Sequence, residues 1–153
     1  MPSSKESPDK KTFETLNKIL ERELAGVVRY THYSFMIYGY NRIPIVSWFR
    51  KQAEESLLHA QEAGELLTSY GEHPSLKIGP LLETHKHDME SILKESLEAE
   101  REALDLYRSL LDQVRDKDIV LDEYARKMIV AEETHAAEVE KMLRKPGEVK
   151  KSA

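Results

Sequence analysis

The residues best suited to chemistry in this sequence are a glutamate and a histidine three positions apart, Glu132 and His135. The segment around them is predicted to be helical, and residues three apart on a helix lie one turn above each other on the same side. Both interrupt a stripe of apolar residues that is expected to be buried. Because an isolated carboxylate or imidazole is costly to bury, we expect a partner there, such as a metal ion.

The other three predicted helices interrupt their buried stripes in the same way, with Glu23, Glu100 and the pair Glu55 and His59. Glu55 lies about 40° around the helix axis from His59 and Glu54 about 140°, so we expect Glu55 to face inward. Four buried carboxylates would repel one another without cations, and carboxylates with imidazoles suit iron or manganese. The predicted metal ligands are Glu23, Glu55, His59, Glu100, Glu132 and His135.

Apolar residues recur with a helical period along most of the chain, which predicts helices over about 7–38, 45–70, 84–114 and 120–144. No alternating strand pattern competes with them. Ser7 and Pro8 are expected to start the first helix, and Gly26 within it to mark a close helix contact. Two prolines and a glycine between Gly71 and Glu83 favour a long crossover.

These elements predict an all-α fold, an antiparallel four-helix bundle with a long crossover between the second and third helices. The bundle is expected over residues 9–144, with a disordered segment at 1–8 and a polar tail at 145–153. His85 and His87 lie two apart near the start of the predicted third helix and so would not face each other. We expect them at the solvent or at an interface rather than at a second metal site.

Composition excludes several classes of function. The net charge of −5, without a basic run, argues against general nucleic-acid binding. The absence of cysteine excludes disulfides, thiolate metal sites and cysteine nucleophiles. No signal-like segment begins the chain, and no apolar run approaches the roughly 20 residues that span a bilayer. A protein of the cytoplasm is expected, with no membrane partner.

The pattern resembles the ferritin-like diiron carboxylate proteins, and bacterioferritin most closely. In that family two helices give one glutamate each and the other two give Glu-x-x-His. The resemblance covers about residues 12–143. It is carried by Glu23-Leu24 with Tyr30, His59-Ala60, Glu100-x-x-Ala103 with Tyr107, and Glu132-Glu133-Thr134-His135.

The resemblance implies two iron ions per subunit, with manganese as a possible replacement. Glu23 and His59 would hold one ion. Glu100 and His135 would hold the other, and Glu132 would bridge them. Tyr30 resembles the family's tyrosine near the site, which can hydrogen-bond a ligand or supply an electron.

The sequence departs from the family at three points. Ser56 stands where the family has its second-helix glutamate, and a π-bulge between Glu55 and His59 would restore the usual geometry. Leu57 replaces the methionine that binds haem in bacterioferritins, so no haem is predicted. Pro146-Gly147 follows the fourth helix, where larger family members have a fifth. A homo-oligomer is expected, and a dimer, a smaller cage and a modified ring remain open.

The leading functional hypothesis is a ferroxidase that oxidises Fe²⁺ to Fe³⁺ with dioxygen or hydrogen peroxide, in iron storage or detoxification. A manganese catalase or a peroxidase on the same scaffold is an alternative. A third hypothesis is a non-enzymatic helical assembly protein whose buried acids pair with Arg22, Arg29 or Arg101.

Overall fold

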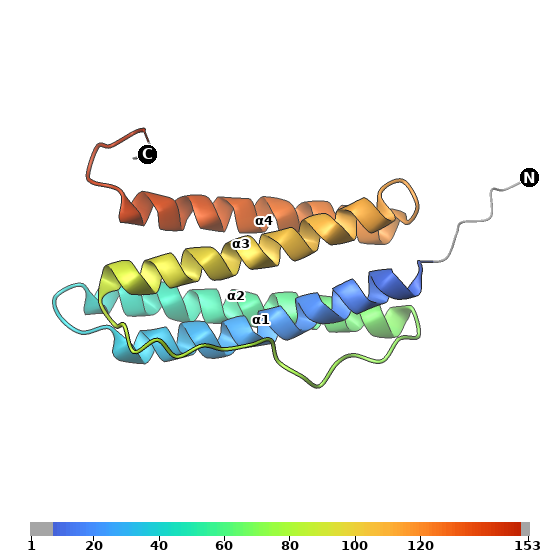
Figure 1. Cartoon of the computed structure of the whole chain (residues 1–153), viewed down its shortest axis with the longest axis horizontal. Coiled ribbons are helices and arrows are strands. Elements are labelled where there is room, and N and C mark those ends of the chain that lie inside the picture. Colours follow the sequence, from blue (N-terminus) through green and yellow to red (C-terminus); the bar gives the residue numbers. More distant parts are fainter. Residues whose placement is uncertain (1–7, 151–153) are drawn as a thin grey trace, which may run out of the picture.

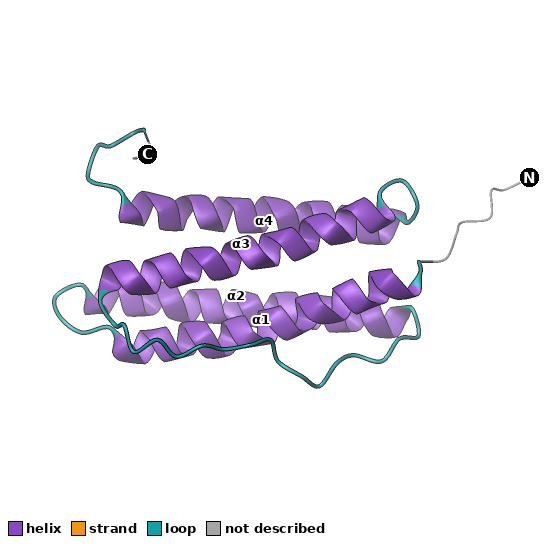
Figure 2. Cartoon of the chain, viewed as in Figure 1, coloured by secondary structure: helices purple, strands orange, loops and turns teal. Residues whose placement is uncertain are grey.

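The computed structural model describes residues 8–150, which form four long helices without a strand among them. The helices are α1 (Lys10–Met36), α2 (Arg42–Ser69), α3 (Met89–Val114) and α4 (Ile119–Leu143) (Figures 1 and 2). α1 and α4 run in one direction, and α2 and α3 run in the other. The predicted antiparallel four-helix bundle with a long crossover is therefore confirmed. The predicted disorder at 1–8 falls, except for Pro8, outside the described residues.

The bundle consists of two helical hairpins. α1 packs along α2 and α3 packs along α4, and α1 also contacts α3. In contrast, no Cα atom of α2 lies within 8 Å of a Cα atom of α4. The two hairpins therefore meet closely on one side of the bundle and are joined on the other side only through side chains.

The core is divided along the bundle into two apolar clusters. One surrounds Leu16 and Leu121, and the other surrounds Phe49 and Val139. Every helix contributes residues to both clusters, so each end of the bundle has its own packed core. Between the clusters lies a layer of ionisable side chains, here called the polar layer, which consists of Glu23, His59, Glu100, Glu132 and His135.

The crossover between α2 and α3 follows α1 along much of its length (Figure 1). Gly71, with a φ of 76°, ends α2 as predicted. The backbone N–H of Gly79 donates to the carbonyl oxygen of Glu21 at 2.7 Å. A Cβ atom at Gly79 would lie 3.2 Å from that oxygen, so the close approach depends on glycine.

The start of α1 differs from the prediction. Asp9 caps this helix, because its carboxylate accepts a hydrogen bond from the backbone N–H of Thr12 at 2.9 Å. Pro8 therefore precedes the helix instead of opening it, and Ser7 lies outside the described residues.

The predicted start of the third helix at Thr84 is wrong. α3 begins at Met89, and the Asp88 carboxylate accepts a hydrogen bond from the backbone N–H of Ser91 at 3.0 Å. His85 has a φ of 56°, in the left-handed region, which a continuous right-handed helix cannot contain. Residues 83–87 therefore belong to the crossover. Among the described residues, none of the four helices combines the length and the apolar composition that a membrane span requires.

Asp118 joins the two hairpins at one end of the bundle. Its side chain caps α4 by accepting from the backbone N–H of Leu121 at 2.9 Å, and it accepts from the hydroxyl of Tyr70 at 2.7 Å. We expect Asp118→Ala to lower the free energy of unfolding by about 2 kcal/mol, since it removes both bonds. Asp88→Ala removes a helix cap that does not link the hairpins, so it should lower the free energy of unfolding by only about 1 kcal/mol. Urea unfolding of the metal-free protein measures both, and equal losses would contradict the hairpin link.

Candidate metal centre

Three glutamates of the polar layer are buried and come from three different helices. Glu23 of α1 and Glu132 of α4 are each 5% exposed, and Glu100 of α3 is 8% exposed. His59 of α2 and His135 of α4 lie beside them and are partly buried. Residues far apart in the sequence thus converge at one place in the interior, as the interrupted stripes predict.

The polar layer contains two groups of ligand atoms that share one residue. Within each group the atoms lie within 4.8 Å of one another. Glu23, His59 and Glu132 form the first group, and Glu100, Glu132 and His135 form the second. Glu132 therefore stands between two potential ion positions, which is the place that a bridging carboxylate occupies.

The histidines contact the carboxylates through their Nδ1 atoms. His59 Nδ1 lies 3.5 Å from Glu23 Oε2 and 3.6 Å from Glu132 Oε1. His135 Nδ1 lies 3.1 Å from Glu100 Oε2. These distances bring the imidazoles close enough to share a cation with the glutamates after small side-chain adjustments.

Two buried tyrosines connect α1 and α3 at the polar layer through hydrogen bonds to Glu100 and Glu23. The hydroxyl of Tyr30 donates to Glu100 Oε1, and that of Tyr107 donates to Glu23 Oε1 at 2.7 Å. Burial, and then the nearby glutamate charges, raise the pKa of both phenols well above the usual value, so they remain hydrogen-bond donors. Tyr107 is not among the predicted site residues, although Tyr30 follows Glu23 and Tyr107 follows Glu100 at the same seven-residue spacing.

Burial and the neighbouring carboxylates change the protonation of the layer. Burial, and then the hydrogen bond and charge of Glu100, raise the pKa of Glu132 far above that of a free glutamate. Burial lowers the pKa of His59, but hydrogen bonds to Glu132 and Glu23 outweigh this effect and raise it to about 10. The metal-free layer therefore retains protons at neutral pH, and a cation would displace them.

The donor atoms fit a pair of divalent cations. Glu132 Oε2 is buried without a hydrogen-bond partner among the described residues. A buried carboxylate oxygen requires a partner, and a cation provides one. Three carboxylates with two imidazoles form a mostly hard donor set that suits iron or manganese.

The arginine pairing of the assembly hypothesis is wrong for this structure. Arg22 pairs with Glu102, and Arg101 pairs with Glu140 at 3.3 Å. No ion pair joins Arg29 to a buried glutamate within the described part of the chain. The buried acids are instead paired with histidines.

Glu55 is not buried as expected. Its side chain is exposed and lines a cavity, and it belongs to neither group of ligand atoms. The buried face of α2 is centred on small residues, including Ser56 and Ala60, so Glu55 and His59 share a flank of the helix and not its centre. α2 is α-helical throughout, without the π-bulge that would bring Glu55 inward.

Ser56 explains why the centre of this face has no carboxylate. It is buried, and its Oγ lies 2.8 Å from the position that a Cβ atom at Gly26 would take. The close helix contact predicted at Gly26 is therefore confirmed, and Ser56 is the residue of α2 that lies against Gly26. A longer side chain at this position would press against α1.

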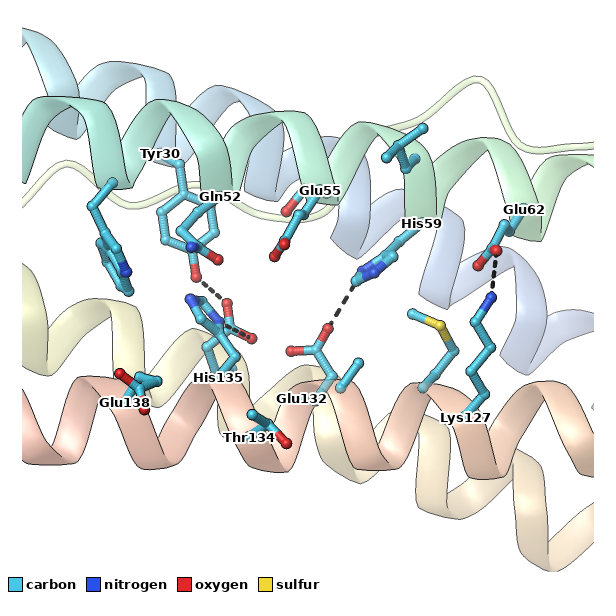
Figure 3. Close-up of a pocket in the computed structure, with 16 residues that line it drawn as sticks. Tyr30, Gln52, Glu55, His59, Glu62, Lys127, Glu132, Thr134, His135 and Glu138 are labelled. Atoms are coloured by element: carbon cyan, nitrogen blue, oxygen red, sulfur yellow. Dashed lines mark hydrogen bonds and ion pairs between the residues drawn. The ribbon is translucent and has the colours of Figure 1, made fainter.

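A cavity of about 580 Å³ leads to the polar layer between α2 and α4 (Figure 3). Trp48 stacks on the ring of His135 at one end, with ring centroids 5.4 Å apart. At the other end, Glu62 and Lys127 form an ion pair of 2.7 Å that spans the two helices. The sequence does not predict this pair, because the two residues are on different helices with no motif in common. The cavity gives small molecules a route to the polar layer.

The fold and the layer together define a class of protein, the four-helix bundles that hold a carboxylate-bridged pair of metal ions. The chain matches the family model for the ferritin-like domain over residues 13–147. It therefore belongs to the ferritin-like family. A search of the curated proteins finds no match to the chain.

Solved structures of the same family are similar over most of the chain. A ferritin-like diiron-carboxylate protein from Bacillus anthracis str. Ames is 21% identical, with a TM-score of 0.83 over 88% of this chain and 96% of that one. Rhodobacter capsulatus bacterioferritin, solved with a metal-free dinuclear site and haem iron, is 26% identical, with a TM-score of 0.81 over 88% and 84%. A dodecameric thioferritin from Bacteroides fragilis is 22% identical, with a TM-score of 0.78 over 88% and 84%.

The protonated layer predicts an unusual pH dependence. The pKa of Glu132 rises on folding from 4.5 to about 10, and that of His59 rises from 6.5 to about 10. A raised pKa stabilises the folded state at low pH, so the metal-free protein should lose stability as pH increases from about 5 towards 10. Glu132→Gln resembles the protonated side chain and should flatten this dependence, with little change in stability at neutral pH.

Unfolding by urea at several pH values, with and without Mn²⁺, measures both effects. Mn²⁺ should stabilise the wild type more at higher pH, because it replaces protons, and should not stabilise Glu132→Gln. The neighbouring surface variant Glu133→Gln should behave like the wild type. Strong destabilisation of metal-free Glu132→Gln would contradict a protonated Glu132.

Proposed function

We propose that this protein is a ferroxidase, which binds two Fe²⁺ ions per chain and oxidises them to Fe³⁺ with dioxygen or hydrogen peroxide. The observation that carries the proposal is the pair of ligand groups that share Glu132 in the buried polar layer. Iron storage or detoxification is the biological setting that this reaction serves. Manganese fits the same donors, so elemental analysis of the protein as purified is part of the test.

The side chains of this protein bind the iron ions, provide negative charge beside them and line the cavity through which they enter. Fe²⁺ enters through the cavity between α2 and α4 and takes the place of protons on Glu132 and His59. Two Fe²⁺ ions each lose one electron, and dioxygen takes up both electrons with two protons to form hydrogen peroxide. The three glutamates favour the product charge of Fe³⁺ over that of Fe²⁺, which lowers the cost of oxidation.

We propose Glu55 as a further ligand at the mouth of the cavity. Figure 3 shows its carboxylate on α2 between Gln52 and His59, pointing into the space towards α4. Its exposure allows the side chain to move, so it is suited to closing over bound ions rather than to holding them before they arrive. From this position Glu55 would supply the α2 carboxylate that Ser56 does not supply at the centre of the buried face.

Tyr30 is proposed as a catalytic residue. Its hydroxyl orients Glu100, which belongs to the second ligand group. If the phenol supplies one of the two electrons in place of an Fe²⁺ ion, it must also lose its proton, and Glu100 is placed to accept it. A phenol with a raised pKa does not lose that proton alone, so the two transfers would occur together. The remaining Fe²⁺ ion then returns an electron to the tyrosyl radical, which takes its proton back, so that both ions are still oxidised.

The assembly of the protein and its location in the cell are also proposed. A structural neighbour from Bacteroides fragilis is a dodecamer, which supports a homo-oligomer for this chain without fixing its size. Leu57 has no ligand atom at the position of the bacterioferritin haem methionine, so we propose that no haem is bound in that manner. We place the protein in the cytoplasm, where Fe²⁺ is its substrate.

Iron oxidation by variants tests the function. We expect anaerobic Fe²⁺ titration of the wild type to saturate near two ions per chain and oxygen to oxidise both rapidly. Glu100→Ala removes a buried ligand and should slow oxidation by at least about tenfold, whereas the exposed Glu98→Ala should not. Glu55→Ala should weaken binding more than Glu54→Ala. Wild-type oxidation no faster than in buffer, or unaffected by Glu100→Ala, would remove the proposal.

Tyr30→Phe separates metal binding from electron supply. We expect this variant to bind two Fe²⁺ ions per chain, because the glutamates and histidines remain, but to oxidise them about tenfold more slowly. A tyrosyl radical signal in electron paramagnetic resonance should appear in the wild type and be absent from the variant. Tyr33→Phe, which loses a hydrogen bond to Glu95 outside the centre, is the matched control. Unchanged kinetics in Tyr30→Phe would exclude a catalytic role.

A further inference from the structure

A second group of metal-ligating side chains lies outside the core, in the crossover just before α3. Glu83, His85 and His87 each place a ligand atom within 4.8 Å of the others. The rings of His85 and His87 are perpendicular, with centroids 6.3 Å apart. No residue of this group, here called the crossover triad, belongs to the polar layer.

The triad forms because the third helix starts later than predicted. On a helix, residues two apart point to different sides, but this restriction does not apply to the crossover, where the backbone of His85 is left-handed. Glu83, His85 and His87 are alternate residues of the segment that precedes Met89. The expectation that His85 and His87 do not face each other is therefore wrong, since it assumed a helix from Thr84.

Hydrogen bonds fix the carboxylate of the triad. Glu83 Oε1 accepts from the backbone N–H of His85 at 2.6 Å, and its Oε2 lies 2.9 Å from Nε2 of His32 on α1. His85 has a φ of 56°, in the left-handed region, which histidine adopts more readily than most residues other than glycine. Through its hydrogen bonds, Glu83 is tied to both the crossover and the outer face of α1.

The residue between the ligands anchors the segment to the bundle. The hydroxyl of Thr84 donates to Glu95 Oε1 on α3, and the hydroxyl of Tyr33 on α1 donates to Glu95 Oε2 at 3.0 Å. Tyr33 is buried, so this connection reaches the core. The backbone that carries the triad is therefore held by two helices, which favours a defined arrangement of the ligands over a mobile one.

We propose that Glu83, His85 and His87 form a surface site for a divalent transition-metal ion of the Zn²⁺ type, separate from the dinuclear centre. Two imidazoles with one carboxylate are a ligand set that Zn²⁺ uses, with a fourth position left for water or another group. This set is richer in nitrogen than the polar layer and so prefers the softer borderline ions. His32 is a positioning residue, which orients Glu83 as an outer hydrogen-bond partner orients a metal ligand.

Binding has a structural consequence that can be measured. The ligands are exposed or only partly buried, so an ion can reach them directly from solvent. Once bound, it links three residues of the crossover, one of which contacts α1. The backbone amides of residues 83–88 should then exchange hydrogen more slowly, whereas amides in the loop between α3 and α4 should not change.

The test uses Zn²⁺ alone and a chain whose dinuclear centre has been disabled by Glu100→Ala and Glu132→Ala. Equilibrium dialysis should find one Zn²⁺ ion per chain, and further substitution of His85→Ala or His87→Ala should weaken its binding by at least about tenfold. His73→Ala changes an exposed histidine of the same crossover outside the triad, and it should leave binding unchanged.

A second measurement does not depend on the folding of the chain that carries Glu100→Ala and Glu132→Ala. In the otherwise unaltered protein, the double variant His85→Ala and His87→Ala should bind one Zn²⁺ ion fewer than the wild type and lose the slowed exchange at 83–88. Its oxidation of Fe²⁺ should be unchanged, so failure of this site and failure of the ferroxidase proposal are distinguishable. The proposal is overturned if Zn²⁺ binding and hydrogen exchange in these histidine variants match those of the wild type.

Discussion

The constraint on which this structure depends is the burial of like charges between two apolar cores. Glu23, Glu100 and Glu132 are placed where each helix would otherwise present an apolar residue. Three carboxylates that are buried close together cannot all ionise unless protons or cations neutralise part of their charge. The metal-free layer compensates with retained protons and two histidines, and a pair of cations would compensate more completely.

The same constraint explains the asymmetric packing of the bundle. α1 contacts both α2 and α3, whereas α2 and α4 do not approach each other closely. The side chains that face each other across the α2–α4 gap include most of the polar layer and the lining of the cavity (Figure 3). Ions held by His59 on one helix and by Glu132 on the other would join the hairpins where apolar packing does not. Metal binding and the stability of the bundle are therefore expected to be coupled.

The fold was largely predictable from the sequence because four long helical periods leave few alternatives. The inward carboxylates at 23, 100 and 132 were predictable as well, since an acid in an apolar stripe is conspicuous. The position of Glu55 was not, because its assignment took His59 as the centre of the buried face, which small residues such as Ser56 in fact define. Glu55 and Ser56 are consecutive, so a single 100° step around the helix separates the predicted inward residue from the one that is buried.

The interactions between elements were the least predictable part. Tyr107 reaches Glu23 across the bundle, and Glu62 pairs with Lys127 across the cavity, although no sequence spacing links either pair. The crossover triad was missed for a different reason, which is local. The cap at Asp88 and the left-handed backbone at His85 delay the third helix, and that delay brings the histidines together.

The central claim is that Glu132 stands between two cations, one on each side. Crystals soaked anaerobically in Fe²⁺ and measured at the iron absorption edge test it most directly. Two anomalous peaks are predicted, one contacted by Glu23 and His59 and the other by Glu100 and His135, with Glu132 in contact with both. A single peak, or none in the polar layer, would contradict the account.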